Sequence, residues 1–122
     1  MPNILLVEPD RELAEIISKY LSADYAVQVC TNAQEAISTA DKNKPEVIIL
    51  ELAIPEHNGA AFLQELRSYQ DWLDIPVIIY SRIARESIGL TPEEWEKFGV
   101  RGYLYKPTKT LADLKRSVNQ AI

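Results

Sequence analysis

Four polar residues stand directly after short apolar stretches, where strands of a sheet are expected to end. In chain order they are Glu8 after ILLV, Glu51 after VIIL, Ser81 after VIIY and Lys106 after GYLY. Open parallel sheets carry their sites at the carboxyl ends of the strands, so these two carboxylates, one hydroxyl and one ammonium are expected to converge. A solvated loop explains each residue alone, whereas four such residues at strand ends indicate a site.

Other kinds of catalytic or binding site find little support in the sequence. Ser81 has no histidine at strand-end spacing that would activate it, which speaks against a serine hydrolase. His57 is the only histidine and has no second histidine or cysteine near it, so it is not expected to bind a metal. Neither GxGxxG nor GxxxxGKS/T is present, and nucleotide binding therefore has no support.

The elements that must position these residues alternate between strand and helix. The first, third and fourth strands are apolar nearly throughout, which is typical of strands covered on both faces in a parallel sheet. The second strand alternates more and is expected to be less central. The five predicted strands are Ile4–Val7, Tyr25–Cys30, Val47–Leu50, Val77–Tyr80 and Gly102–Tyr105.

The segments between the strands show helical patterns with recognisable starts. Asp10 is expected to cap a helix whose apolar residues fall on one face. Asn32 and Glu35 resemble a capping box that opens a helix running to about Asn43. The remaining helices are expected at Gly59–Tyr69, after Thr91 and from Thr108.

Length and charge limit the class of protein. The 122 residues are expected to form a single domain, residues 1–122, in which helical crossovers between parallel strands build an open, doubly wound α/β sheet. A net charge of −5 without a lysine–arginine cluster disfavours direct nucleic-acid binding. No apolar run approaches the roughly 20 residues of a membrane span. No basic leader precedes the first strand, and the lone Cys30 suits a reducing compartment, so we expect a cytoplasmic protein.

The sequence resembles the receiver domains of two-component response regulators. The resemblance covers the whole chain through ILLVEPD, IILELAIPEHNG, PVIIYS and GYLYKP, whose order and spacing are specific when taken together. It implies a flavodoxin-like, three-layer α/β/α sandwich with five helices and a five-stranded parallel sheet in the order 2-1-3-4-5. It also implies a role in signalling. In this family an aspartate accepts a phosphoryl group, and the new charge biases a loop-and-strand element that partners read.

The site residues of the family can be placed on this sequence one by one. Glu51 takes the phosphate-accepting position, Ser81 the position of the hydroxyl that bonds the phosphate, and Lys106 that of the charge-screening lysine. Glu8 takes the first position of an acidic pair that helps to hold Mg²⁺. The resemblance also suggests a cis peptide bond between Lys106 and Pro107, which would aim the lysine at the site.

Three residues depart from the family's pattern. Glu51 is one methylene longer than aspartate, which displaces its carboxylate by roughly 1–1.5 Å. Pro9 stands where the family usually has a second acid, so one oxygen ligand for Mg²⁺ is lost. Arg82 replaces a small side chain and is long enough to pair with Glu51 or Glu8. Together they predict a receiver that no longer accepts phosphate, in which Glu51 either mimics the phosphorylated state or only holds the empty site together.

The alternative is a working phosphorelay receiver that accepts phosphate from a histidine kinase despite these changes. We expect no independent enzyme activity, no cofactor and no metal. Should the family's Mg²⁺ chemistry survive, Glu8, Asp10 and Glu51 are the candidate ligands.

The expected partners are proteins of a signalling pathway, a histidine kinase or an output domain among them, with no membrane partner. Tyr103 falls at the family's aromatic switch position. Tyr105 and Trp95 lie on the face that binds partners in receivers. That face, formed by the fourth helix, the fifth strand and the fifth helix, also pairs second copies.

Overall fold

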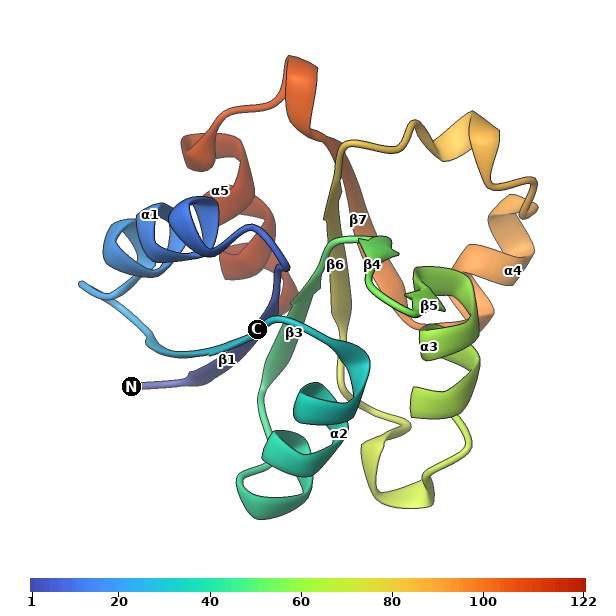
Figure 1. Ribbon diagram of the computed structural model, residues 1–122, viewed down its shortest axis with the longest axis horizontal. Helices are drawn as coiled ribbons and strands as arrows, with labels where there is room; N and C mark the ends of the chain where they lie inside the picture. Colours follow the sequence, from blue (N-terminus) through green and yellow to red (C-terminus); the bar gives the residue numbers. More distant parts are fainter.

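The computed structural model describes residues 1–122 with the exception of the His57 side chain, so the metal-binding question raised for that residue lies outside the described part. The chain alternates between strands and helices (Figure 1). The strands are β1 Asn3–Val7, β2 Ala26–Cys30, β3 Val47–Leu50, β4 Ala53–Ile54, β5 His57–Asn58, β6 Val77–Ser81 and β7 Val100–Tyr105. The α-helices are α1 Arg11–Leu21, α2 Ala33–Lys42, α3 Gly59–Leu66, α4 Pro92–Lys97 and α5 Leu111–Ala121. Short 3₁₀ turns occur at Gln70–Trp72, Arg85–Ser87 and Lys106–Thr108.

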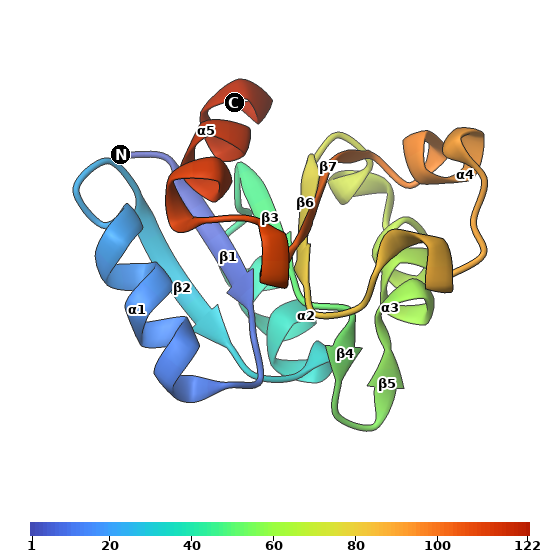
Figure 2. The same cartoon turned by 90° about the horizontal axis from the view of Figure 1, so that it is seen from above.

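The main sheet has five parallel strands in the order β2-β1-β3-β6-β7. Counted along the chain within this sheet, the order is 2-1-3-4-5, as the resemblance implies. The fourth and fifth strands of this sheet are labelled β6 and β7 because the strands of a small antiparallel hairpin, β4–β5, come between them and β3 in the sequence. The sequence did not predict this hairpin, since two-residue strands are too short to show a period. It projects from the edge at which the arrowheads of β1 and β2 end (Figure 2).

Burial explains the order of the strands. Every residue of β3 and β6 is buried, and so are four of the five residues of β1, whereas β2 and β7 are largely exposed or half-buried. The apolar runs therefore mark the strands that are covered on both faces, and the alternating β2 forms an edge, as predicted.

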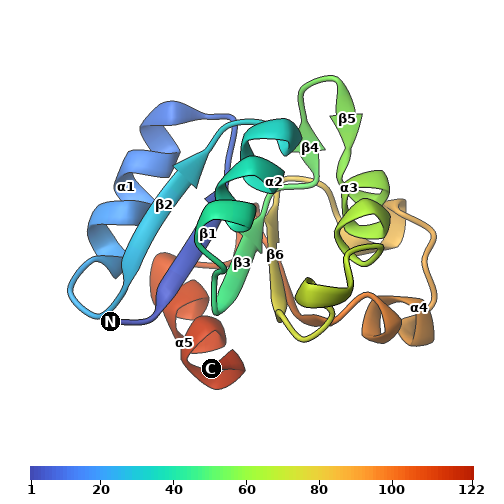
Figure 3. The same cartoon turned by 90° about the horizontal axis from the view of Figure 1, so that it is seen from below.

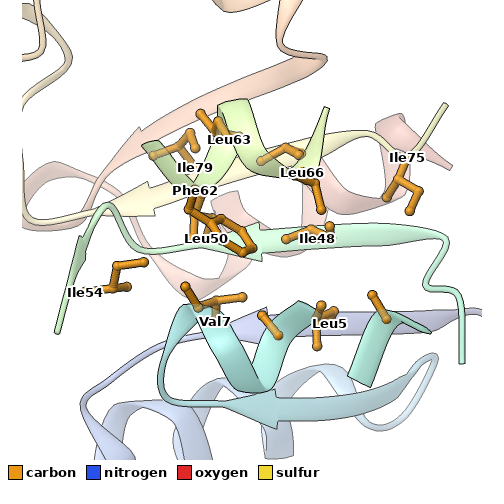
Figure 4. Close-up of a cluster of buried hydrophobic side chains, with 14 of the residues drawn as sticks. Leu5, Val7, Ile48, Leu50, Ile54, Phe62, Leu63, Leu66, Ile75 and Ile79 are labelled. Atoms are coloured by element: carbon orange, nitrogen blue, oxygen red, sulfur yellow. The ribbon is translucent and has the colours of Figure 1, made fainter. Parts of the chain in front are cut away.

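Helices cover both faces of the sheet. One buried cluster joins α1 and α5 to the sheet, and the other joins α2, α3 and α4 to its opposite face. Figure 4 shows the second cluster, in which Phe62 and Leu63 of α3 pack against Leu50 of β3 and Ile79 of β6. The rigid sheet between two packed layers fixes where each strand ends.

Helix starts follow the predicted caps except at the last helix. Asp10 accepts hydrogen bonds from the backbone of Glu12 and Leu13 at 3.1 Å, and Asn32 caps α2. The reciprocal half of the predicted box is wrong, because the Glu35 side chain accepts from the backbone N–H of Thr31 at 2.9 Å and not from that of Asn32. The predicted start at Thr108 is wrong, because the last helix begins at Leu111. Thr110 caps it in a reciprocal box with Asp113, and this pair of bonds prevails over Thr108.

The third helix ends earlier than predicted, at Leu66, because of Arg67. The half-buried guanidinium of Arg67 donates to the carbonyls of Trp72 at 2.6 Å, Phe98 at 2.8 Å and Ile75. These bonds turn the chain away from the helix axis. They also attach the turn after α4 to the segment that leads into β6.

Candidate functional site

Glu8, Glu51, Ser81 and Lys106 come together at the carboxyl edge of the sheet. Glu8 follows β1, Glu51 follows β3, Ser81 is the last residue of β6, and Lys106 follows β7. Three of them are almost fully enclosed, with 2% of Glu8, 2% of Glu51 and none of Ser81 exposed to solvent. Since buried charges are stable only when they are paired, the contacts of the two carboxylates define the site.

Both oxygens of Glu51 accept two hydrogen bonds each. Oε1 accepts from Lys106 Nζ at 2.8 Å and from the backbone N–H of Arg82 at 3.1 Å. Oε2 accepts from the backbone N–H of Ala53 at 3.1 Å and from the Ser81 hydroxyl. The carboxylate is therefore fully coordinated by donors from the last residue of β6 and from the segments that follow β3, β6 and β7.

Lys106 joins the two acids. Its ammonium donates to Glu8 Oε1 at 2.7 Å as well as to Glu51, and only 16% of its side chain is exposed. The other oxygen of Glu8 accepts from the Asp10 backbone N–H at 3.1 Å. The Lys106–Pro107 bond is trans, so the cis bond suggested by the resemblance is wrong. A 3₁₀ turn at Lys106–Thr108 follows instead.

Burial and pairing act in opposite directions on the titration of Glu51. Burial raises the pKa of Glu51, but hydrogen bonds from Lys106, Ser81 and the two backbone N–H groups outweigh it, and the pKa lies below its ordinary value. Burial likewise lowers the pKa of Lys106, and its bonds to Glu51 and Glu8 outweigh that effect and raise the pKa. The charged forms of both residues are therefore favoured by folding.

These shifts predict a pH dependence of stability. A carboxylate whose pKa is depressed by folding stabilises the native state above its unfolded value, 4.5 here, and loses this contribution as the pH falls through the folded value. The unfolding free energy should therefore fall between pH 5 and pH 3 by about 1 kcal/mol more in the wild type than in Glu51→Gln. Urea unfolding followed by circular dichroism at several pH values measures this difference. Parallel curves for the two proteins would contradict the prediction.

Arg82 does not fill the role predicted for its side chain. The residue is exposed, and among the described residues its guanidinium forms no ion pair with Glu51 or Glu8. Its contribution to the site is the backbone N–H that Glu51 accepts. The predicted pairing of this side chain with Glu51 or Glu8 is therefore wrong, because an exposed arginine gains little from reaching toward acids that already bond Lys106.

The residues present do not fit the Mg²⁺ that the resemblance implies. Pro9 offers no side-chain oxygen, and Asp10 uses its Oδ1 to cap α1. The oxygens of Glu8 and Glu51 face hydrogen-bond donors, an ammonium among them. Mg²⁺ demands near-octahedral oxygen coordination, and within the described residues no group of three acidic, histidine or cysteine side chains could hold a metal.

Sequence reasoning missed the backbone donors of the site. The N–H groups of Ala53 and Arg82 carry half of the bonds to Glu51, and the Ile83 N–H donates to Ser81 Oγ at 3.0 Å. Backbone groups are common to every residue type, so the sequence holds no signal for them.

A continuous line of contacts leads from the site to α4. The Tyr103 hydroxyl, on β7, donates to the carbonyl of Ile83 at 2.6 Å. Its ring meets that of Trp95 edge to face, with centroids 5.3 Å apart. Burial and the nearby charge of Glu51 raise the pKa of Tyr103 to about 12, so its hydroxyl stays protonated as a donor. Trp95 is buried, and Tyr105 is half-buried beside this line.

Removing the Tyr103 hydroxyl should loosen the segment after β6. Tyr103→Phe leaves the Ile83 carbonyl without this donor, which costs about 1 kcal/mol of unfolding free energy. Faster amide hydrogen exchange is expected at residues 82–84. Tyr105→Phe is the matched control, because no described hydrogen bond involves the Tyr105 hydroxyl, and its change should stay within about 0.5 kcal/mol. Equal effects of the two variants would refute the assigned role of the hydroxyl.

Solved structures show the same fold. The chemotaxis response regulator CheY4 of Vibrio cholerae superposes with a TM-score of 0.85 at 22% identity, over 100% of this chain and 99% of that one. TrrA of Thermotoga maritima, in complex with Mg²⁺ and BeF, gives a TM-score of 0.82 at 20% identity over the full length of both chains.

Among the described residues, none of the helices combines the length and apolar character needed to cross a bilayer.

The chain is similar in sequence to part of longer proteins. The chain is 31% identical to the KDP operon transcriptional regulatory protein KdpE of Escherichia coli over 108 residues, which is 88% of this chain and 45% of the relative. It is 31% identical to a protein-glutamate methylesterase/protein-glutamine glutaminase of Treponema denticola over 109 residues, 87% of this chain and 28% of the relative. The chain thus spans less than half the length of these relatives. The family model of the response regulator receiver domain matches residues 4–119, and with the fold and the strand-end cluster this places the chain in the receiver domain family.

Proposed function

We propose that residues 1–122 form a receiver domain that signals without phosphorylation, through protein contacts. Glu51 serves in it as a permanent charge. A transferable phosphoryl group would occupy the place where the Glu51 carboxylate now accepts its bonds. The domain then has no independent enzyme activity and uses no cofactor, and it works in the cytoplasm, as two-component receivers do.

The observation that carries this proposal is the full coordination of Glu51. In the family, the hydroxyl residue bonds the phosphate and the lysine screens its charge. Here Ser81 and Lys106 make the corresponding bonds to the Glu51 carboxylate itself. A phosphoryl acceptor needs an oxygen free to attack, and each oxygen of Glu51 already accepts two hydrogen bonds. This arrangement favours the hypothesis that Glu51 mimics the phosphorylated state over the hypothesis that it only holds the empty site together.

The contacts beyond Glu51 also support the hypothesis that Glu51 mimics the phosphorylated state. Glu51 holds the start of the segment after β6 through Ser81 and Arg82, and Ile83 connects that segment to Tyr103. A charge at residue 51 therefore biases the position of Tyr103 in the way that a transient phosphate would. Glutamate supplies about one negative charge against the phosphate's 1.5 to 2, so the bias is expected to be partial.

The face that partners read is proposed to lie between α4 and β7. A cavity of about 590 Å³ opens there, and its lining includes Trp95 and Tyr103, the two rings at the end of the line of contacts. Among the described residues, the buried indole nitrogen Nε1 of Trp95 has no hydrogen-bond partner. A histidine kinase or an output domain is the proposed partner. A second copy of the chain, docked through α4, β7 and α5, is the alternative occupant.

The proposal is tested by incubating the domain with acetyl phosphate and Mg²⁺ and measuring its intact mass. The expected result is an unchanged mass under conditions in which a receiver with an aspartate acceptor gains one phosphoryl group. Stoichiometric phosphorylation of the wild-type chain would overturn the proposal and leave a working phosphorelay receiver as the function.

A further inference from the structure

A second cavity lies on the face of the sheet covered by α2 and α3, and no role has been assigned to it. It has a volume of about 850 Å³ and runs between the two helices. Figure 3 shows α2 and α3 next to each other on this face, beneath the β4–β5 hairpin. We call it the α2–α3 groove and describe it by six of its lining residues: Ala33, Ile37, Asp41, Glu65, Tyr69 and Trp72.

The sequence of α2 explains why a groove remains there. The buried residues of this helix are alanines, at positions 33, 36 and 40. Small side chains bring α2 close to the sheet but add little volume toward α3. Ile37 is consequently only half-buried, although it packs against the core from this helix. The floor of the groove is therefore apolar and partly open to solvent.

An aromatic pair forms one wall of the groove. The rings of Tyr69 and Trp72 lie with their centroids 4.5 Å apart. Trp72 is 5% exposed, but Tyr69 is 40% exposed, which is unusual for an aromatic ring that packs on a core residue. An exposed ring over an apolar floor offers a surface for the stem and the charged head of a cationic side chain.

The charge of the lining is predominantly acidic. Asp41, Glu56 and Glu65 contribute carboxylates, against the single guanidinium of Arg11. Asp41 is exposed, and the described residues include no cation paired with it. With a net charge of −5 on the whole chain, the groove disfavours phosphates and nucleic acids and attracts cations.

From these features we infer that the α2–α3 groove is a docking site for a basic, amphipathic helix of a partner protein. Residues 33 to 41 extend over about 12 Å along α2, which matches two turns of a bound helix. Apolar side chains of the partner would rest on Ile37 and Trp72, and its arginine or lysine side chains would reach Tyr69 and Asp41. The site is separate from the α4–β7 face, so both could be occupied at once.

The test uses the full chain, labelled with ¹⁵N, and a ten-residue amidated peptide with leucines and arginines at helical spacing. Its twin carries glutamine in place of each arginine. The expected result is a saturable set of amide shifts confined to residues 33–41 and 65–72. Binding of the twin should be at least tenfold weaker. Asp41→Lys should weaken the arginine peptide about fivefold to tenfold.

Glu93→Lys, an equal change of charge at an exposed position on α4, is the matched control and should leave the affinity unchanged. Shifts centred on another face, equal binding of the two peptides, equal weakening by both variants, or no saturable shift at millimolar peptide would each overturn the inference. Glu51→Gln should bind the peptide as the wild type does. Failure of this inference is therefore distinguishable from failure of the proposed function.

Discussion

Replacement of Lys106 by methionine is expected to cost about 3–5 kcal/mol of unfolding free energy at pH 7. The variant keeps most of the side-chain volume but removes the ammonium that lies 2.7 Å from Glu8 and 2.8 Å from Glu51. Two carboxylates, each 2% exposed, are then left in the same enclosed space without a counter-ion. Urea unfolding followed by circular dichroism measures the loss.

Three companion measurements identify the cause of that loss. Lys109→Met removes an exposed lysine three residues along, and its unfolding free energy should change by no more than about 0.5 kcal/mol. Glu51→Gln added to Lys106→Met should recover part of the stability, because it removes one of the unpaired charges. Lowering the pH toward 4 should narrow the gap to the wild type, as the carboxylates take up protons. A loss below about 1 kcal/mol would contradict the prediction that Lys106 is needed to stabilise the buried carboxylates of Glu8 and Glu51.

Phosphorylation should be regained when the site is returned to the family's pattern at two positions. In Glu51→Asp the carboxylate retreats by about 1.5 Å, the length of one carbon–carbon bond, and can no longer reach all four of its donors. In Pro9→Asp an oxygen ligand appears beside Glu8, where Mg²⁺ lacks one. The double variant is expected to change from no detectable phosphoryl transfer to nearly complete modification by acetyl phosphate, as measured by intact mass.

The single variants separate the two causes. Glu51→Asp alone should be modified slowly, and Pro9→Asp alone should not be modified, because Glu51 still occupies the site. Arg82→Ala is expected to add little to the double variant, since the exposed guanidinium makes no described contact with the acids and the backbone N–H is retained. A folded double variant that resists modification would mean that these two departures do not account for the proposed inability of the domain to accept phosphate.

Much of the site could be predicted because it depends on topology. The apolar runs that end at Val7, Leu50 and Tyr80 belong to strands buried on both faces, and parallel strands end at one edge whatever their loops contain. The types and positions of Glu8, Glu51 and Lys106 then suffice to predict an ion-paired cluster.

The remaining details depend on competition between groups that the sequence presents as equal. Thr108 and Thr110 are both suitable caps, and only the acid three residues after Thr110 distinguishes them. The side chain of Arg82 has many conformations of similar energy, and its sequence position does not select one. Arg67 gave no signal of its own, since its partners are carbonyl groups.

The anchoring of α4 by Arg67 has a mechanical consequence. The guanidinium fixes the carbonyl of Phe98 at the end of this helix, directly before Gly99. The φ of Gly99 is 74°, and a Cβ at this position would collide with Nη2 of Arg67. The opposite end of α4 is joined to β6 by residues 82–91, with one 3₁₀ turn at 85–87. The carboxyl end of α4 is thus the end that Arg67 holds, beside Gly99. Any displacement of α4 is therefore expected to be larger at Pro92 than at Gly99, with the contact between Trp95 and Tyr103 lying between the two ends.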